Sequence, residues 1–106
     1  MLSEGRVMDR LFDLAQQAAQ LEQAWRSKLL ARVGDTSLKL TRMDAQAYPD
    51  ETHAYVEGLL VLDGELHLDV AGETVTVAAG QLYMVPAGVS HAVRPGSHGT
   101  LLIIDA

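Results

Sequence analysis

The chain has 106 residues, of which 48% are hydrophobic and 21% charged, and its formal net charge is -6. This length predicts one domain, and the acidic balance argues against a nucleic-acid partner, because phosphate contacts need clustered lysine and arginine. No apolar run approaches the ~18 residues of a membrane-spanning helix, so no membrane partner is expected. The chain has no cysteine, which excludes disulfides and thiolate catalysis and leaves histidine and carboxylate as the strong metal ligands.

The amino-terminal segment predicts one amphipathic helix over residues 6–24. Apolar residues recur at the three-to-four spacing of one helix face: Val7, Leu11, Leu14, Ala15, Ala18, Leu21 and Trp25. An isolated helix of this length is marginal in water, so its apolar face is expected to pack on the body of the fold or against a second copy. The first residues, MLSEGRVMDR, lack the apolar stretch of a secretory signal, and a cytoplasmic location is therefore expected.

After Trp25 the chain changes to short runs of alternating apolar and polar residues separated by turn signals, which predicts antiparallel strands. A first hairpin is expected to turn at Gly34 and Asp35, with Leu38, Leu40 and Met43 on its apolar face. The sequence predicts a second hairpin at the Asp-Gly pair between GLLVL and ELHLDV, because this pair readily takes the positive φ values of a type I′ turn. Ala-Gly before ETVTV predicts a third turn. The strands QLYMV, HAV and TLLIID follow.

About eight strands at roughly ten-residue spacing, with no helix between them, predict an all-β fold rather than a βαβ layout. A barrel or jelly-roll sandwich fits that strand number, and such folds often enclose a ligand cavity. Residues 1–26 are expected to form the helix, for packing or dimerisation, and residues 27–106 the barrel, within a single domain.

Two separated segments follow recognisable spacing patterns. His53, Glu57 and Gly64 match the second half of the pattern G-x5-H-x-H-x3,4-E-x6-G, in which Glu51 replaces the first histidine and Ala45 the opening glycine. A second pattern, G-x5-P-x-G-x2-H-x3-N, is matched by Gly80, Pro86, Gly88 and His91, with Pro95 at the final position. These are the two cupin motifs, and the chain resembles a small single-domain cupin over residues 45–95. The resemblance implies a cupin double-stranded β-helix, or jelly-roll barrel, behind an amino-terminal α-helix.

The same resemblance implies one metal site inside the barrel, held by His53, Glu57 and His91, with Glu51 as a changed fourth ligand. Residues 51, 53 and 57 have the same parity and so project to one face of an extended chain, and a loop precedes His91 that can bring it to the same cavity. Two imidazoles and a carboxylate suit Fe(II), Mn(II), Zn(II) or Ni(II), among which the spacing does not choose.

Glu51 has three readings. As a ligand it adds a second negative charge to the site, so that the two carboxylates together cancel the charge of a divalent cation and make the metal a weaker Lewis acid. Without metal, two carboxylates in one enclosed pocket repel, and one of them tends to hold a proton. In the third reading Glu51 turns outward and leaves a plain triad. His67 and His98 are expected on the surface. Tyr55, Tyr83 and Met84 are candidates for the cavity lining, although aromatic and methionine side chains on strands are more often part of the core.

The function expected from these residues is that of a metal-binding cupin of small-molecule metabolism. Its ligand would be a compact polar organic molecule such as a hydroxy acid, keto acid or sugar derivative, with Glu51 orienting it or acting as general base. The alternative is a non-catalytic module that binds or senses a small molecule or metal. Because small cupins generally pair, the resemblance also implies a homodimer, for which Trp25 and Leu29 would make a suitable anchor.

Overall fold

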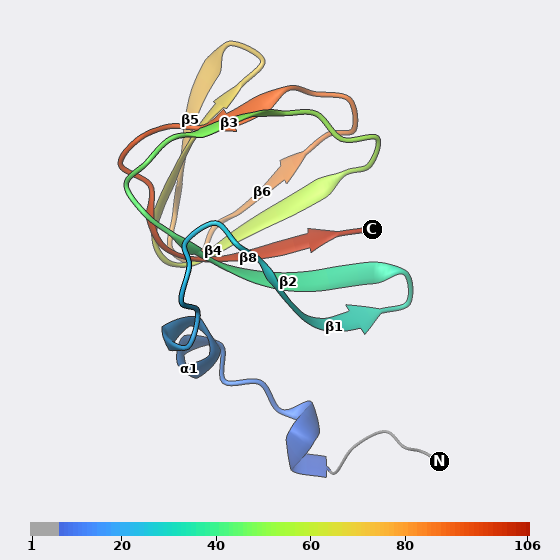
Figure 1. Cartoon of the computed structure of the whole chain (residues 1–106). Helices are drawn as coiled ribbons and strands as arrows, with labels where there is room; N and C mark the ends of the chain where they lie inside the picture. The colour runs from blue at the N-terminus through green and yellow to red at the C-terminus, as the bar shows by residue number, and fades with distance from the viewer. Residues whose placement is uncertain (1–6) are drawn as a thin grey trace.

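The computed structural model describes residues 7–106, and Figure 1 shows them as a curled sheet with a short helical segment at one end. The helical elements are a 3-10 turn, Val7–Arg10, and α1, Leu14–Ala19. The strands are β1 Lys28–Val33, β2 Thr36–Met43, β3 Tyr48–Glu51, β4 Glu57–Val70, β5 Glu73–Ala78, β6 Leu82–Val85, β7 His91–Val93 and β8 His98–Asp105. The predicted all-β class is therefore confirmed.

All strand pairs are antiparallel, in the order β1-β2-β8-β4-β7-β3, and β5 and β6 also pair with β4. Strand β4 is the central strand of the sheet, since it pairs with four other strands along its length. The sheet curls around a core of inward-facing side chains: Met43, Leu59, Val61, Leu66, Leu68, Val70, Val77, Val85 and Leu101. The predicted turns at Gly34-Asp35 and Ala71-Gly72 are both present, as the β1–β2 and β4–β5 hairpins.

The predicted hairpin at Asp63-Gly64 is wrong. Strand β4 continues through this pair, and its register against β8 shifts between Val61 and Asp63, which marks a bulge. The bulge changes which residues face the core, because inward positions are odd-numbered up to Val61 and even-numbered from Leu66 onward. The positive φ of Gly64, +80°, therefore belongs to a bend within a long strand and not to a hairpin turn.

Strand β2 presents its polar side to the inside. Lys39 and Thr41 line the internal cavity, whereas Leu40 is fully buried on the opposite side and is no part of the main core cluster. Helix α1 contacts β2, and Ala18 of α1 is likewise buried outside that cluster. Of the apolar residues Leu38, Leu40 and Met43 in β2, only Met43 belongs to the main core cluster.

The continuous helix expected over residues 6–24 is also wrong, and its first residue lies outside the described part of the chain. Asp13 caps a new helix by accepting a hydrogen bond from the Gln16 amide at 3.0 Å, so α1 starts only at Leu14. At the other end, the Arg42 guanidinium donates to the Leu21 carbonyl at 3.2 Å and the Glu22 carbonyl at 2.9 Å, which holds that stretch against β2 in a non-helical path. Within residues 7–106, no helix is long and apolar enough to cross a bilayer.

The homodimer stays a prediction, and the exposed apolar side chains indicate where to test it. Leu29 on the edge strand β1 is 48% exposed, and Val7, Met8 and Leu11 are at least 70% exposed. We expect light scattering after size exclusion to give the mass of two chains, and Leu29→Lys to reduce it to one. Leu82→Lys is the matched control, because Leu82 is equally exposed, at 52%, on β6. A single-chain mass for the unmodified protein would contradict the dimer.

Candidate metal centre

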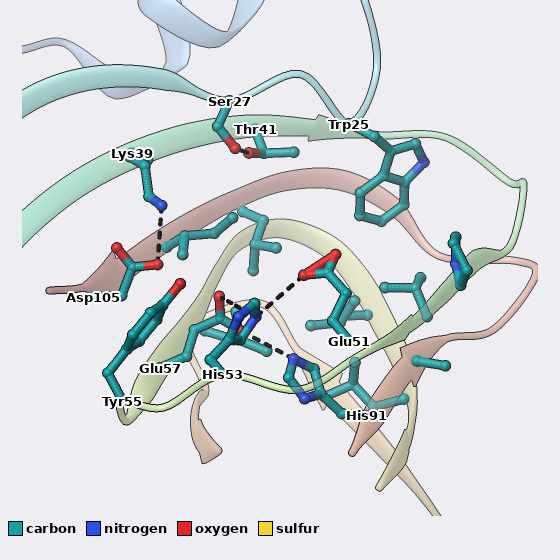
Figure 2. Close-up of a pocket in the computed structure, with 18 residues that line it drawn as sticks. Trp25, Ser27, Lys39, Thr41, Glu51, His53, Tyr55, Glu57, His91 and Asp105 are labelled. Carbon is teal, nitrogen blue, oxygen red and sulfur yellow. Dashed lines mark hydrogen bonds and ion pairs between the residues drawn. The ribbon is translucent and has the colours of Figure 1, made fainter. Parts of the chain in front are cut away.

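Four side chains converge from four segments of the barrel, namely β3, the β3–β4 connection, β4 and β7 (Figure 2). Glu51 ends β3 and is the direct cross-strand partner of His91 on β7, so the two side chains emerge on the same side of the sheet. Glu57 opens β4 opposite Val85 of β6. His53 lies on the connection between β3 and β4. All four residues line one cavity.

The loop that carries His53 is held by its neighbours. The Gly88 amide donates to the His53 carbonyl at 2.7 Å, which ties the β3–β4 loop to the loop that leads into β7. The imidazole stacks on the Tyr55 ring, with centroids 4.9 Å apart and an interplanar angle of 11°. The chain bends at Ala54 and Tyr55, so residues 51, 53 and 57 do not lie on one extended strand. Glu57 points inward because it begins a new strand, β4.

The converging atoms lie close together. His91 Nε2 is 3.1 Å from Glu57 Oε1, and His53 Nε2 is 3.1 Å from Glu51 Oε1 and 3.7 Å from Glu57 Oε2. Ligand atoms of Glu51, His53 and His91 all lie within 4.8 Å of one another. The side chains of His91 and Glu57 are buried, His53 is 19% exposed and Glu51 is the most open at 39%. The closed end of the cluster is thus formed by His91 and Glu57, and the open end by Glu51.

The hydrogen bonds of the His53 and His91 rings are compatible with metal binding. His91 Nδ1 lies 3.1 Å from the Val89 carbonyl, which can only accept, so Nδ1 donates to it, and His91 Nε2 lies 3.1 Å from Glu57 Oε1. Such a bond from the second ring nitrogen to a carbonyl is the usual support of a metal-binding histidine. His53 Nε2 is buried and, despite its short distance to Glu51, has no hydrogen-bond partner in residues 7–106. Two imidazole nitrogens and two carboxylates fit a divalent cation in type and charge.

The cavity around this cluster has a volume of about 310 Å³ and a second polar group on its wall. Lys39 Nζ donates to Asp105 Oδ2 at 2.9 Å, and both side chains line the cavity. Burial raises the pKa of the Tyr55 phenol above its usual 10.0, the Asp105 carboxylate raises it further, and Lys39 opposes this. The phenol therefore stays protonated at neutral pH and can donate a hydrogen bond.

Trp25 forms part of the cavity wall, and its role as a dimer anchor stays a prediction. Its backbone has a positive φ of 63°, its amide donates to the Arg42 carbonyl at 2.8 Å, and its indole N–H donates to Asp44 Oδ1 at 2.8 Å. His67 and His98 lie outside the cavity lining, where His67 Nδ1 is 3.1 Å from Thr76 Oγ1. Of the two positions that the sequence left open for Tyr55, the cavity lining is the one observed, whereas the sequence gave no cavity role to Lys39, Asp105 or Trp25.

Comparison with known proteins agrees with this architecture. Residues 40–106 match the cupin domain family. The chain is a cupin. A cupin-2 domain protein of Shewanella frigidimarina has a similar structure, with a TM-score of 0.82 and 23% identity, covering 89% of this chain and 92% of that one. A Neisseria meningitidis protein gives a TM-score of 0.80 and 26% identity over 90% of this chain and 97% of its own.

One relative of this cupin has a named activity. A quercetin 2,3-dioxygenase of Bacillus subtilis (strain 168) is 41% identical over 58 residues, which are 54% of this chain. The matched stretch spans only 17% of that enzyme's length, so its activity does not pass directly to this chain. The cupins of known structure establish the fold, and the residues inside the barrel carry the functional argument.

Proposed function

We propose that this cupin binds one divalent metal ion through His53, Glu57 and His91, with Glu51 as fourth ligand, and acts on a small organic molecule. The observation that carries the proposal is the buried Nε2 of His53, which has no hydrogen-bond partner among the described residues although two carboxylates stand within 3.7 Å. A buried polar atom without a partner costs free energy, and coordination would remove that cost.

A bound divalent ion supplies Lewis acidity toward an oxygen of the ligand. His91 and Glu57, at the closed end, hold and orient the site, and the bond of His91 Nδ1 to Val89 fixes the ring. Glu51, at the open end, is placed to meet the incoming molecule and to accept a proton from it. The dioxygenase name of the Bacillus relative supports an enzymatic role for this chain.

A second candidate is a non-catalytic module that binds or senses a small molecule. The presence of two carboxylates at the centre favours it, because their charges cancel those of a divalent ion and leave a weak Lewis acid. Turnover of hydroxy acids and sugars by metal-loaded protein separates the two candidates. An enzyme converts at least one of them in proportion to its metal content, whereas the module binds without conversion.

The test of the metal site is elemental analysis after purification without added metal and after reconstitution. We expect one metal ion per chain, and in Glu51→Gln a weaker metal affinity, because the proposed fourth ligand has lost its negative charge. Glu65→Gln is the matched control, since Glu65 Oε2 pairs with His67 Nε2 at 3.2 Å in the same manner but outside the cavity. Reconstituted protein that holds no metal would overturn the proposal.

A further inference from the structure

The cavity contains a second polar group, the Lys39–Asp105 ion pair, which lies away from the four converging side chains (Figure 2). Lys39 comes from the inward face of β2 and Asp105 from the last position of β8. The Asp105 side chain is 2% exposed and that of Lys39 is 31% exposed, so the carboxylate is deep and the ammonium is reachable from the opening. Neither residue belongs to the two cupin motifs.

The pair has unused hydrogen-bonding capacity of both kinds. An ammonium has three N–H groups, and one of them is taken by Asp105 Oδ2. The other two N–H groups of Lys39, and the second oxygen of Asp105, have no hydrogen-bond partner within residues 7–106. The pair thus offers free N–H donors beside a free carboxylate oxygen, which suits a ligand group that accepts one hydrogen bond and donates another.

The charges of the cavity disfavour an anion at this end. Its lining carries one ammonium, Lys39, against three carboxylates, Glu51, Glu57 and Asp105, which sum to -2 with neutral histidines. A divalent cation in the metal centre brings that sum to zero. Because the charge of Lys39 is already matched by Asp105 at 2.9 Å, a ligand carboxylate would meet a carboxylate at short range without a free cation to compensate.

We propose that the Lys39–Asp105 pair recognises a neutral hydroxyl group of the ligand, with Lys39 donating to the hydroxyl oxygen and the hydroxyl donating to Asp105. The ligand is then a small alcohol or polyol whose other end reaches the metal, and the inference rests on the proposed metal site. The rest of the lining includes the apolar side chains of Trp25, Leu68 and Leu101. It also includes the hydroxyls of Ser27 and Thr41, which are hydrogen-bonded to each other at 2.6 Å. Tyr55 lines the same cavity, and its hydroxyl is a further hydrogen-bond donor there.

The experiment uses the full chain loaded with Zn(II) and three hydroxamic acids that differ only in their far end: hydroxyl, methyl or carboxylate. The hydroxamate anchors each probe on the metal, and three chain lengths are compared so that one spans the cavity. Affinities are measured by calorimetry, with quenching of Trp25, the chain's single tryptophan, as a second readout of cavity occupancy. At the best length we expect the hydroxyl probe to bind about tenfold more tightly than the methyl probe, and the carboxylate probe to bind most weakly.

Variants of the pair separate recognition from folding. Asp105→Asn keeps the side-chain shape and removes the charge, so it should make the carboxylate probe the tightest of the three. Lys39→Met should abolish the preference for hydroxyl over methyl. Lys28→Met is the control, because Lys28 is exposed on β1 outside the cavity, where it donates to Gln17.

The outcomes are distinguishable. Retained zinc with equal affinities for the three probes, or with the carboxylate probe tightest in the unmodified protein, would overturn the hydroxyl assignment alone. An unchanged order of affinities in Asp105→Asn would do the same. If the protein retains no zinc and binds none of the probes, both the metal centre and the hydroxyl assignment fall.

Discussion

Replacing His91 with alanine is expected to abolish metal-dependent stabilisation of this cupin. His91 is buried at the closed end of the site, and its loss removes one of the two imidazoles proposed to hold the metal. A metal held at 100 times its dissociation constant stabilises the folded state by about 2.7 kcal/mol. For a domain of this size that corresponds to a rise in Tm of roughly 10–20 °C. The unmodified protein should show this rise with Zn(II), and His91→Ala should show none.

Thermal unfolding with Zn(II) and with a chelator, together with elemental analysis, provides the measurement. His67→Ala is the matched control, because His67 also faces a glutamate at 3.2 Å but lies outside the cavity lining. This control should respond to Zn(II) as the unmodified protein does. A full zinc-dependent rise in the Tm of His91→Ala would refute the assignment of His91 as a ligand.

The second large effect concerns the contact between Gly64 and Gly99, which face each other across β4 and β8. A Cβ built on Gly64 would lie 2.1 Å from the His98 carbonyl oxygen, and one on Gly99 would lie 2.0 Å from the Asp63 carbonyl oxygen. Backbone atoms in a paired strand cannot move aside cheaply, and both glycines have positive φ. Gly64→Ala should therefore lower the free energy of unfolding by several kcal/mol, a large part of the ~5–15 kcal/mol of a typical domain.

Urea unfolding followed by circular dichroism measures this loss, and Gly72→Ala is the control. Gly72 has nearly the same φ, +86° against +80°, but a Cβ there meets nothing within 4 Å. Its substitution should cost only the backbone strain of a left-handed residue, about 1–2 kcal/mol. Equal losses in Gly64→Ala and Gly72→Ala would show that the close approach of the two strands is unimportant.

The sequence predicts the fold well where local pattern and family spacing agree. Alternation in ELHLDV places Leu66, Leu68 and Val70 inside, and all three are buried. The second motif brings His91 to the end of a loop that aims it at the cavity, since Gly88 in that loop bonds to the segment of His53. The burial of Leu66, Leu68 and Val70 is predictable because it depends only on strand alternation, and His91 is predictable because the motif fixes its spacing from Gly88.

The remaining features depend on partners far away in sequence. Asp63-Gly64 has the composition of a turn, and only the approach of Gly99 makes it a bulge in a continuing strand. Lys39 reads as a solvent-facing residue of an alternating strand until α1 is seen to cover the other side of β2. Asp105 closes the chain's last strand, and nothing near it in sequence indicates that Lys39 lies beside it.

Strand β4 has a consequence for engineering new specificities into this barrel. Its backbone is hydrogen-bonded to β5, β6, β7 and β8, so a mutation that displaces it disturbs half of the sheet. Lys39 and Tyr55, by contrast, stand on a strand and a loop that make no ladder with β4. A library that varies those two positions and leaves β4 unchanged would alter which molecules the barrel binds without disturbing the sheet.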